Sequence, residues 1–212
     1  MNAAPPFDPD RDLLLVIDVQ NDFCPGGSLA IADGDAVLPA IARLMPRFAH
    51  VGLTQDWHPP GHRSFASAYP GRAPFDTAAF PYGEQTLWPD HCVQGTHGAD
   101  FHPALDTARA DVVIRKGFRP QVDSYSAFFE NDRVTPTGLT GYLRERRFTR
   151  LVLCGLATDF CVAWSAIDAR RQGFEVVVPL DACRAIDQAG SLAAALATMR
   201  QVGVTLLEHG AQ

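Results

Sequence analysis

Two residues with side chains suited to catalysis stand in or at the end of apolar runs of this 212-residue chain. Asp18 lies within LLLVIDVQ, and Lys116 ends DVVIRK. A carboxylate inside an apolar run is costly unless it is paired or lies at the open end of a strand. The alternatives are an aspartate that caps a local turn and a solvated lysine at a strand end. Side chains alternate along a strand, so Arg115 points away from the side of Lys116.

Cys161 follows the apolar run RLVLC and a turn at Gly155-Leu156-Ala157. Thr158 or Asp159 is a natural N-cap, which would place Cys161 in the first turn of a helix. Free backbone N–H groups there favour a thiolate and could stabilise an oxyanion. The alternative is a buried helix thiol, but the position at a strand-to-helix elbow favours a nucleophile.

A carboxylate and several imidazoles lie together in the segment after the second apolar run. Asp56 and His58 are two residues apart, so they share one side of an extended segment, and His62 and His91 follow. One carboxylate and two imidazoles can hold a divalent ion and leave coordination positions open. Zinc, iron and manganese all suit such ligands. The alternative is a set of surface histidines, since only the fold can bring His58 and His91 together.

Aromatic residues are interspersed with these polar groups. They could hold a flat ring by stacking, or they could simply anchor loops. Phe23 and Trp88 lie a few residues from a proposed chemical group and are the first candidates. The full set is Phe23, Trp57, Phe65, Trp88 and Tyr125.

Short β-branched runs alternate with helical patterns along the chain. This alternation predicts an α/β protein with a mainly parallel six-stranded sheet and helices on both faces, in a three-layer Rossmann-like arrangement. The runs lack polar alternation, which suggests strands covered on both faces. Gly173 is a plausible helix stop. We expect strands at 13–19, 50–54, 111–115, 150–154, 174–178 and 204–207, and helices at 35–48, 138–147, 158–172 and 188–201.

Two irregular segments, 55–105 and 116–136, interrupt this alternation. Each begins where an expected strand ends, on the side where open α/β sheets bind ligands. Long loops in a compact domain are usually functional. We therefore expect a single domain over 1–212, with a metal-binding insertion loop at about 55–105.

Composition excludes several classes of protein. The net charge of −6 offers no basic surface for nucleic acid, and no apolar run approaches the roughly 18 residues of a membrane helix. No signal peptide is evident, and the odd number of cysteines has no C-x-x-C spacing, so we expect a cytoplasmic protein with reduced thiols. The cysteines other than Cys161 read as structural: Cys24, Cys92, Cys154 and Cys183.

Five segments in a fixed order together resemble the nicotinamidase (pyrazinamidase) family of the isochorismatase-like hydrolases. Any one of them alone is a weak signal, but the combination is specific. They are VIDVQNDFCPGGSL (16–29), QDWHPPGHRSFAS (55–67), LWPDHCVQGTHGADFHP (87–103), RKGFRPQVDSYSAFFEN (115–131) and LVLCGLATDFCV (151–162).

The resemblance implies an isochorismatase-like hydrolase fold and hydrolysis of nicotinamide to nicotinate and ammonia, through a cysteine thioester, in NAD salvage. Pyrazinamide would be a further substrate. A divalent ion, with zinc first and iron or manganese as alternatives, would position the pyridine ring. Whether the protein forms a homo-oligomer stays open. By position, the resemblance implies a catalytic triad of Asp18, Lys116 and Cys161. It implies that the metal ligands are Asp56, His58 and His91, with His62 less certain, and that Phe23, Trp88 and Tyr125 contact the ring of the substrate. It further implies a cis peptide at Leu156–Ala157 and an oxyanion hole formed by the backbone amides of Ala157 and Cys161.

Three other readings stay open at this point. The first is another isochorismatase-like enzyme, such as an isochorismatase or a different small-amide amidase. The second is a metal-only hydrolase in which Cys161 is structural. The third is a non-catalytic binding module, although the chain lacks G-x-G-x-x-G after its first strand and has no P-loop.

Overall fold

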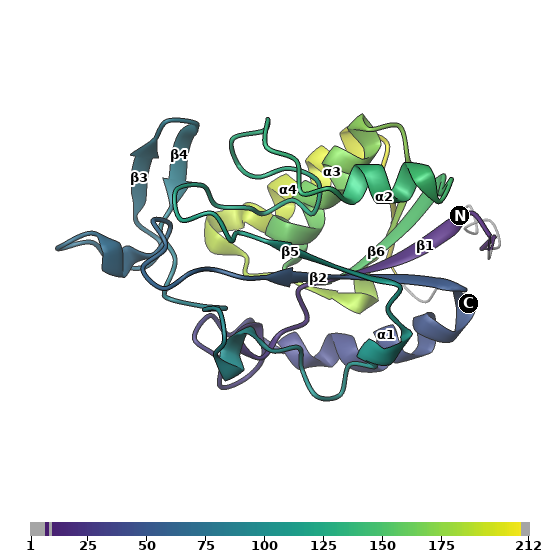
Figure 1. The fold of residues 1–212 in the computed structure, drawn as a ribbon, viewed down its shortest axis with the longest axis horizontal. Helices are drawn as coiled ribbons and strands as arrows, with labels where there is room; N and C mark the ends of the chain where they lie inside the picture. The colour runs from purple at the N-terminus through teal and green to yellow at the C-terminus, as the bar shows by residue number, and fades with distance from the viewer. Residues whose placement is uncertain (1–6, 9, 209–212) are drawn as a thin grey trace.

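A parallel β-sheet runs through the middle of the molecule in the computed structural model, which describes residues 7, 8 and 10–208 (Figure 1). Its strand order is β5-β2-β1-β6-β7-β9, with β8 paired to β6, and every pair is parallel. The six expected strands are all present, and a two-residue strand makes the seventh. The strands are β1 (Asp12–Ile17), β2 (His50–Asp56), β5 (Val112–Lys116), β6 (Arg150–Leu156), β7 (Glu175–Pro179), β8 (Cys183–Arg184) and β9 (Thr205–Leu207).

The strand order reverses between β1 and β6 at the centre of the sheet. The chain passes outward from β1 to β2 and β5, and then returns across the sheet to β6. Connections from two such neighbouring strands leave toward opposite faces, which opens a crevice at their carboxyl ends. Asp18 directly follows β1 and Cys161 follows β6, so both lie at this crevice.

Helices cover both faces of the sheet, which confirms the three-layer α/β prediction. α1 (Leu38–Leu44) lies on one face, and α2 (Leu139–Glu145), α3 (Ala163–Arg171) and α4 (Ser191–Gln201) lie on the other (Figure 1). Each helix is shorter than expected. Short turns replace the expected ends of three helices: 3₁₀ turns at Gly34–Val37 and Met45–Arg47 flank α1, a π-helical turn at Thr158–Val162 precedes α3, and a 3₁₀ turn at Gln188–Gly190 precedes α4. Further 3₁₀ turns lie in the connections, at Asn21–Phe23, Ala66–Ala68, His97–Ala99, Thr107–Arg109 and Leu180–Ala182.

Two helix ends have a clear local cause. Pro46 cannot donate a backbone hydrogen bond, so the helix expected to reach residue 48 gives way to a 3₁₀ turn at Met45. Gly173 adopts a φ of +94° beyond α3 and donates to the Arg170 carbonyl, as expected of a helix stop.

The prediction that every strand is covered on both faces is wrong for β5. β1 and β6 are buried throughout, whereas β5 alternates, with Val113 43% exposed and Lys116 fully buried. The reason is that β5 is an edge strand of the sheet. Arg115 does point away from Lys116, and its guanidinium lies 4.0 Å from the centre of the Trp57 ring.

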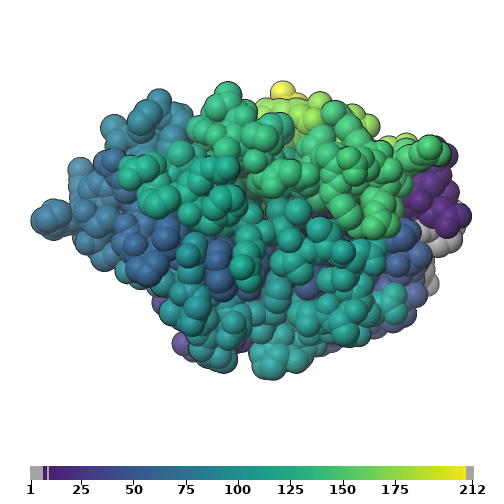
Figure 2. Space-filling view, viewed as in Figure 1, coloured from purple at the N-terminus to yellow at the C-terminus, as the bar shows by residue number. Residues whose placement is uncertain are grey.

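A small antiparallel hairpin lies within the segment expected to be irregular. It consists of β3 (Thr77–Phe80) and β4 (Gly83–Thr86). Figure 1 places it beyond the carboxyl end of β2, and the space-filling view shows this part of the chain forming one end of the molecule (Figure 2). Its sequences, TAAF and GEQT, lack the β-branched alternation that would predict strands.

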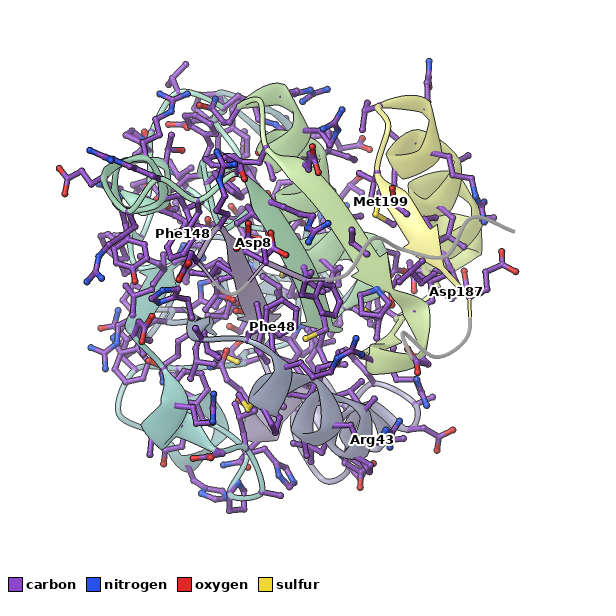
Figure 3. All side chains as sticks on the ribbon, turned by 90° about the vertical axis from the view of Figure 1, so that its right-hand side faces the viewer. Asp8, Arg43, Phe48, Phe148, Asp187 and Met199 are labelled. Atoms are coloured by element: carbon purple, nitrogen blue, oxygen red, sulfur yellow. The ribbon has the colours of Figure 1, made fainter. Side chains whose placement is uncertain are left out.

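The opposite end of the sheet is closed by buried aromatic rings. Phe48 follows α1 on one face and Phe148 follows α2 on the other, and both lie near the start of β1 (Figure 3). Arg150 forms a buried ion pair with Asp12 at the same end. The crevice at the carboxyl ends is therefore the part of the sheet left for chemistry. No helix of residues 7, 8 and 10–208 is long and apolar enough to cross a membrane.

Gly155 is predicted to be intolerant of any side chain. Its φ is +113°, and a Cβ atom there would lie 2.2 Å from the Ile17 carbonyl oxygen of the neighbouring strand. Gly155→Ala should lower the free energy of unfolding, measured in urea, by on the order of 3 kcal/mol.

Gly141→Ala is the matched control for this substitution. Gly141 is exposed within α2 and has open space around its Cβ position. Alanine there should stabilise the protein by about 0.5–1 kcal/mol. Equal unfolding midpoints for the two variants would contradict the prediction.

Candidate active site

Asp18, Lys116 and Cys161 meet in the crevice between the central strands. Lys116 is the last residue of β5, and its side chain reaches across β2. Its Nζ lies 2.8 Å from Asp18 Oδ2 and donates to Cys161 Sγ at 3.4 Å and to the Ser124 carbonyl at 2.9 Å. All three site residues are buried.

Asp18 is held in place by a residue that the sequence analysis did not single out. Thr54 of β2 donates its hydroxyl to Asp18 Oδ1 at 2.6 Å, and the Asp18 N–H donates to the same hydroxyl oxygen at 3.2 Å. Thr54 stands two residues before Asp56, so strand alternation places both side chains on one face. This spacing is the feature of the sequence from which the role of Thr54 could have been predicted.

Cys161 lies in a π-helical turn rather than in the first turn of an ordinary α-helix. The Val162 N–H donates to the Ala157 carbonyl five residues back, and Ala157 occupies the capping position without a side-chain cap. The expectation that Thr158 or Asp159 caps this helix is therefore wrong. Asp159 instead accepts hydrogen bonds from the backbone N–H groups of residues 186 and 187. The peptide bond before Ala157 is cis, as the resemblance implied.

Burial keeps the Cys161 thiol protonated in the free protein. It raises the pKa of Cys161 well above its usual value, and the opposing effect of Lys116 does not cancel this rise. Burial also raises the pKa of Asp18, against the effect of Lys116. The thiol and the Asp18 carboxylate both contact Lys116 Nζ, so a carboxylate with increased proton affinity stands beside the thiol and can accept its proton.

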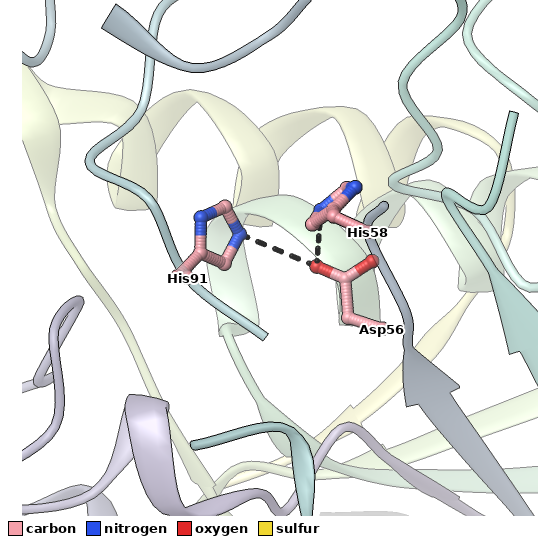
Figure 4. Close-up of side chains that lie close together, drawn as sticks. All are labelled: Asp56, His58 and His91. Carbon is pink, nitrogen blue, oxygen red and sulfur yellow. Dashed lines mark hydrogen bonds and ion pairs between the residues drawn. The ribbon is translucent and has the colours of Figure 1, made fainter. Parts of the chain in front are cut away.

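Asp56, His58 and His91 form a three-ligand group beside this arrangement (Figure 4). Asp56 Oδ2 lies 3.1 Å from His58 Nε2 and 3.3 Å from His91 Nε2. One ligand atom from each residue falls within 4.8 Å of the others, and all three residues are buried. The other oxygen of Asp56 lies 3.1 Å from Lys116 Nζ, so this carboxylate joins the metal group to the cysteine site.

The tautomers of the two histidines fit a bound cation. His58 Nδ1 lies 2.9 Å from the Gly117 carbonyl and His91 Nδ1 lies 2.8 Å from the Pro89 carbonyl, so each Nδ1 carries the proton. In the neutral rings both Nε2 lone pairs then face the Asp56 carboxylate oxygen. Three acceptors that converge in this way need a positive charge between them, which a divalent metal supplies. Burial alone would raise the pKa of Asp56, but a protonated His58, which supplies this positive charge when no metal is bound, and Lys116 hold it well below its usual range.

His62 lies behind this group rather than in it. Its ring centre is 4.6 Å from that of His58, and both of its nitrogens are engaged with protein atoms. Nδ1 accepts from the Ser64 N–H at 3.1 Å, which leaves Nε2 to donate to the Arg119 carbonyl at 2.8 Å. A histidine with neither lone pair free is not available to a metal, so the geometry speaks against the optional fourth ligand.

A cavity opens above the thiol and the metal group. All three expected ring contacts line it, as do Ala157 and Cys161. Asp123 also lines it, with one oxygen 3.9 Å from His58 Nε2, and was not anticipated. Phe65 packs instead behind the histidines, 5.3 Å from the His58 ring. The complete lining is Phe23, Leu29, Asp56, Trp88, His91, Asp123, Tyr125, Ala157, Phe160, Cys161 and Ile186.

Comparison with known proteins identifies the family and the fold. Residues 12–211 match the profile of the Isochorismatase domain. The chain belongs to the isochorismatase family. Among its relatives are a nicotinamidase of Acinetobacter baylyi, 55% identical over 90% of this chain and 89% of the relative, and a nicotinamidase of Escherichia coli, 44% identical over 93% and 94%. These identities place it in the nicotinamidase/pyrazinamidase branch of the isochorismatase family.

Solved structures of the isochorismatase family agree with this placement. A nicotinamidase/pyrazinamidase of Acinetobacter baumanii superposes with a TM-score of 0.93 at 54% identity, covering 95% of this chain and 97% of that one. A structure from L. infantum in complex with nicotinate gives 0.83 at 41%, covering 94% and 93%. A pyrazinamidase of Pyrococcus horikoshii in complex with zinc gives 0.76 at 33%, covering 94% and 99%.

Lys116 is predicted to be essential for the stability of this isochorismatase-family chain. In Lys116→Met the carboxylates of Asp18 and Asp56 lose their shared cation, which should lower the free energy of unfolding by about 3–5 kcal/mol at pH 8. Lys116 opposes the burial that raises the pKa of Asp18, so its loss raises that pKa further. A carboxyl group whose pKa is raised in the folded state stabilises the protein at low pH, and this stabilisation is lost as the pH rises. The difference in the free energy of unfolding between Lys116→Met and the wild type should therefore be smaller at pH 5 than at pH 8.

Urea unfolding in the presence of a chelator measures this effect without a metal ion on Asp56. Arg200→Met is the matched control, because Arg200 forms an exposed ion pair with Glu208 at 3.3 Å. Its loss should cost less than about 1 kcal/mol at either pH. A Lys116→Met deficit that is equally small, or that grows on acidification, would refute the account.

Proposed function

We propose that this chain is a nicotinamidase that hydrolyses nicotinamide to nicotinate and ammonia, with Asp18, Lys116 and Cys161 as its catalytic triad. The observation that carries the proposal is the contact of Lys116 with both Asp18 and Cys161, with Cys161 lining an aromatic cavity beside a three-ligand group suited to a metal. The nicotinamidase relatives at 55% and 44% identity support the same activity.

The cavity offers a place for a flat aromatic amide. Phe23 and Trp88 line it and are almost fully buried, so a ring between them makes apolar contact on both faces. The carboxamide then points toward Cys161, the thiol at the base of the same cavity. Binding in this orientation brings the carbonyl carbon and the sulfur together before reaction, which is a large part of catalysis.

The first half of the reaction transfers the acyl group to Cys161. As sulfur attacks the carbonyl carbon, the thiol proton passes to Asp18, and Lys116 keeps Asp18 oriented and favours negative charge on sulfur. The backbone N–H groups of Ala157 and Cys161 would stabilise the tetrahedral oxyanion. When the carbon–nitrogen bond breaks, Asp18 returns the proton to the departing nitrogen, which leaves as ammonia, and a thioester remains.

The second half releases the product. Water attacks the thioester carbon while Asp18 accepts a proton from it, and a second oxyanion forms at the same two N–H groups. The carbon–sulfur bond then breaks, Asp18 returns the proton to the Cys161 sulfur, and the product leaves as the acid, which loses its remaining proton to water to give nicotinate. Asp18 thus acts alternately as base and acid, a role that suits a carboxyl group whose pKa is raised.

Asp56, His58 and His91 would hold one divalent ion. When bound, this ion would supply a Lewis-acidic template for the ring nitrogen of the substrate. Zinc is our first proposal for its identity, with iron or manganese as alternatives, because the pyrazinamidase of Pyrococcus horikoshii is described in complex with zinc. The protein's own contribution is the fixed Nδ1 hydrogen bonds that orient both imidazoles.

Three wider assignments belong to the same proposal. Pyrazinamide, another flat heteroaromatic amide, would be a further substrate, as the name of the Acinetobacter baumanii enzyme suggests for that protein. The chain would act as one domain, since the 55–105 segment supplies ligands to a site on the common sheet. A cytoplasmic location would suit its five unpaired, buried thiols, and a role in NAD salvage would follow from the hydrolysis of nicotinamide.

Cys161 is predicted to be indispensable for turnover. Cys161→Ala removes the atom that bonds to the acyl group, so ammonia release from nicotinamide should fall at least about a thousandfold. Cys183→Ala is the matched control, since Cys183 is also buried but lies on β8. It should retain activity within a few-fold. Undiminished ammonia release by Cys161→Ala would reject the thioester mechanism.

Metal binding is predicted to depend on His91 but not on His62. His91→Ala loses one of three ligands and should retain less than about a tenth of the wild-type metal content after dialysis, measured by mass spectrometry of the metals. His62→Ala should keep near wild-type content, because its two nitrogens bond to protein atoms. Metal loss in both variants, with cooperative unfolding preserved, would restore His62 as a ligand.

A further inference from the structure

Gln85 is the only residue of the two hairpin strands that is buried. The other residues of β3 and β4 are exposed or half-buried, whereas Gln85 is 2% exposed. Burying a polar amide in place of an apolar side chain is unfavourable unless all its hydrogen bonds are satisfied. The hairpin therefore directs toward the protein interior one side chain whose function is to make hydrogen bonds.

The Gln85 amide connects two residues that line the active-site cavity. Its Nε2 carries two N–H groups and has three acceptors within reach, Asp123 Oδ2 at 2.8 Å, Tyr125 Oη at 2.7 Å and the Thr86 carbonyl at 2.8 Å, so one N–H is shared between two acceptors. Its Oε1 accepts from Asn131 Nδ2 at 3.0 Å. Asn131 Oδ1 in turn accepts from the Tyr125 N–H, so both ends of the amide bind the 117–136 segment.

The orientation of this amide is determined by its partners. A carboxylate and the Thr86 carbonyl, at 2.8 Å, lie on the Nε2 side, and both can only accept. The Asn131 amide nitrogen lies on the Oε1 side and can only donate. A flipped amide would place oxygen against oxygen on one side and nitrogen against nitrogen on the other.

The network ends on the indole that we propose as a wall of the ring site. Tyr125 Oη, which accepts from Gln85, also accepts from Trp88 Nε1 at 3.1 Å. The Trp88 and Tyr125 rings meet edge to face, with centres 6.0 Å apart. Loss of the Gln85 donor would free the phenol, and with it the hydrogen bond that orients Trp88.

We propose that Gln85 is a positioning residue for substrate binding, acting through Tyr125 Oη on the Trp88 wall of the cavity. This inference rests on the proposed function. Gln85 touches neither the cysteine nor the metal ligands, so it should affect recognition of the aromatic ring and not the chemical step. The β3–β4 hairpin, from this viewpoint, is the support that carries Gln85 into the interior.

The test compares Gln85→Leu with Glu84→Leu in the full-length, metal-loaded enzyme. Glu84 is the exposed neighbour on the same strand. For Gln85→Leu, KM for nicotinamide should rise about tenfold while kcat stays within threefold. Inactivation by iodoacetamide should keep its wild-type rate, since the thiol side is untouched. Glu84→Leu should match the wild type in all three measurements.

A double-mutant cycle with Tyr125→Phe separates positioning from general destabilisation. If Gln85 acts through the phenol oxygen, Gln85→Leu should raise KM less than threefold in the Tyr125→Phe background. A tenfold effect in both backgrounds, an unchanged KM, or a fall in kcat alone would overturn the inference.

Hydrogen–deuterium exchange over 86–92 and 120–131 measures the wall without substrate. It should be faster in Gln85→Leu than in the wild type and unchanged in Glu84→Leu. Unchanged exchange in Gln85→Leu would overturn the positioning role. A wild type without amidase activity would instead overturn the proposed function, and the exchange comparison would still decide whether Gln85 orders the wall.

Discussion

Lys116 brings one positive charge between the carboxylates of Asp18 and Asp56, 2.8 and 3.1 Å away, in an interior that water does not reach. Burial alone would lower the pKa of Lys116, but the two carboxylates raise it well above its usual value, so the ammonium keeps its charge. In a low-dielectric interior such a contact stabilises only a complete set of partners. The register of the strands and the position of Cys161 must therefore keep all the partners of Lys116 in place together.

The fold and most of the candidate site could be predicted because each key residue stands at or just after the end of a strand. Carboxyl ends of parallel strands meet at one edge of a sheet, so Asp18, Asp56, Lys116 and Cys161 had to come close once the parallel order was known. The resemblance chose His91 over His62 as the third metal ligand, a choice that no periodicity could make within a long loop. Cys161 was favoured among five cysteines by its position at a strand-to-helix elbow, and the resemblance then assigned it to the triad.

Other features depend on contacts that local sequence does not encode. The edge position of β5 follows from the strand order, which its own VVIRK sequence does not reveal. The π-helical turn at Thr158–Val162 and the uncapped Ala157 depend on the diversion of Asp159 to residues 186 and 187. Gln85 could not be recognised because a glutamine in an exposed-looking hairpin shows its importance only through partners 38 to 46 residues away.

The position of Lys116 on an edge strand has a consequence for how the protein loses activity. β5 pairs with β2 on one side only, whereas the strands that lead to Asp18 and to Cys161 are paired on both sides. Segments at a sheet margin open by fraying at a lower free energy than central ones. Such a partial opening would withdraw the buried ammonium while the rest of the sheet stays folded. Inactivation under mild denaturation should therefore precede global unfolding, and the margin of the sheet, rather than its core, limits the working range of the enzyme.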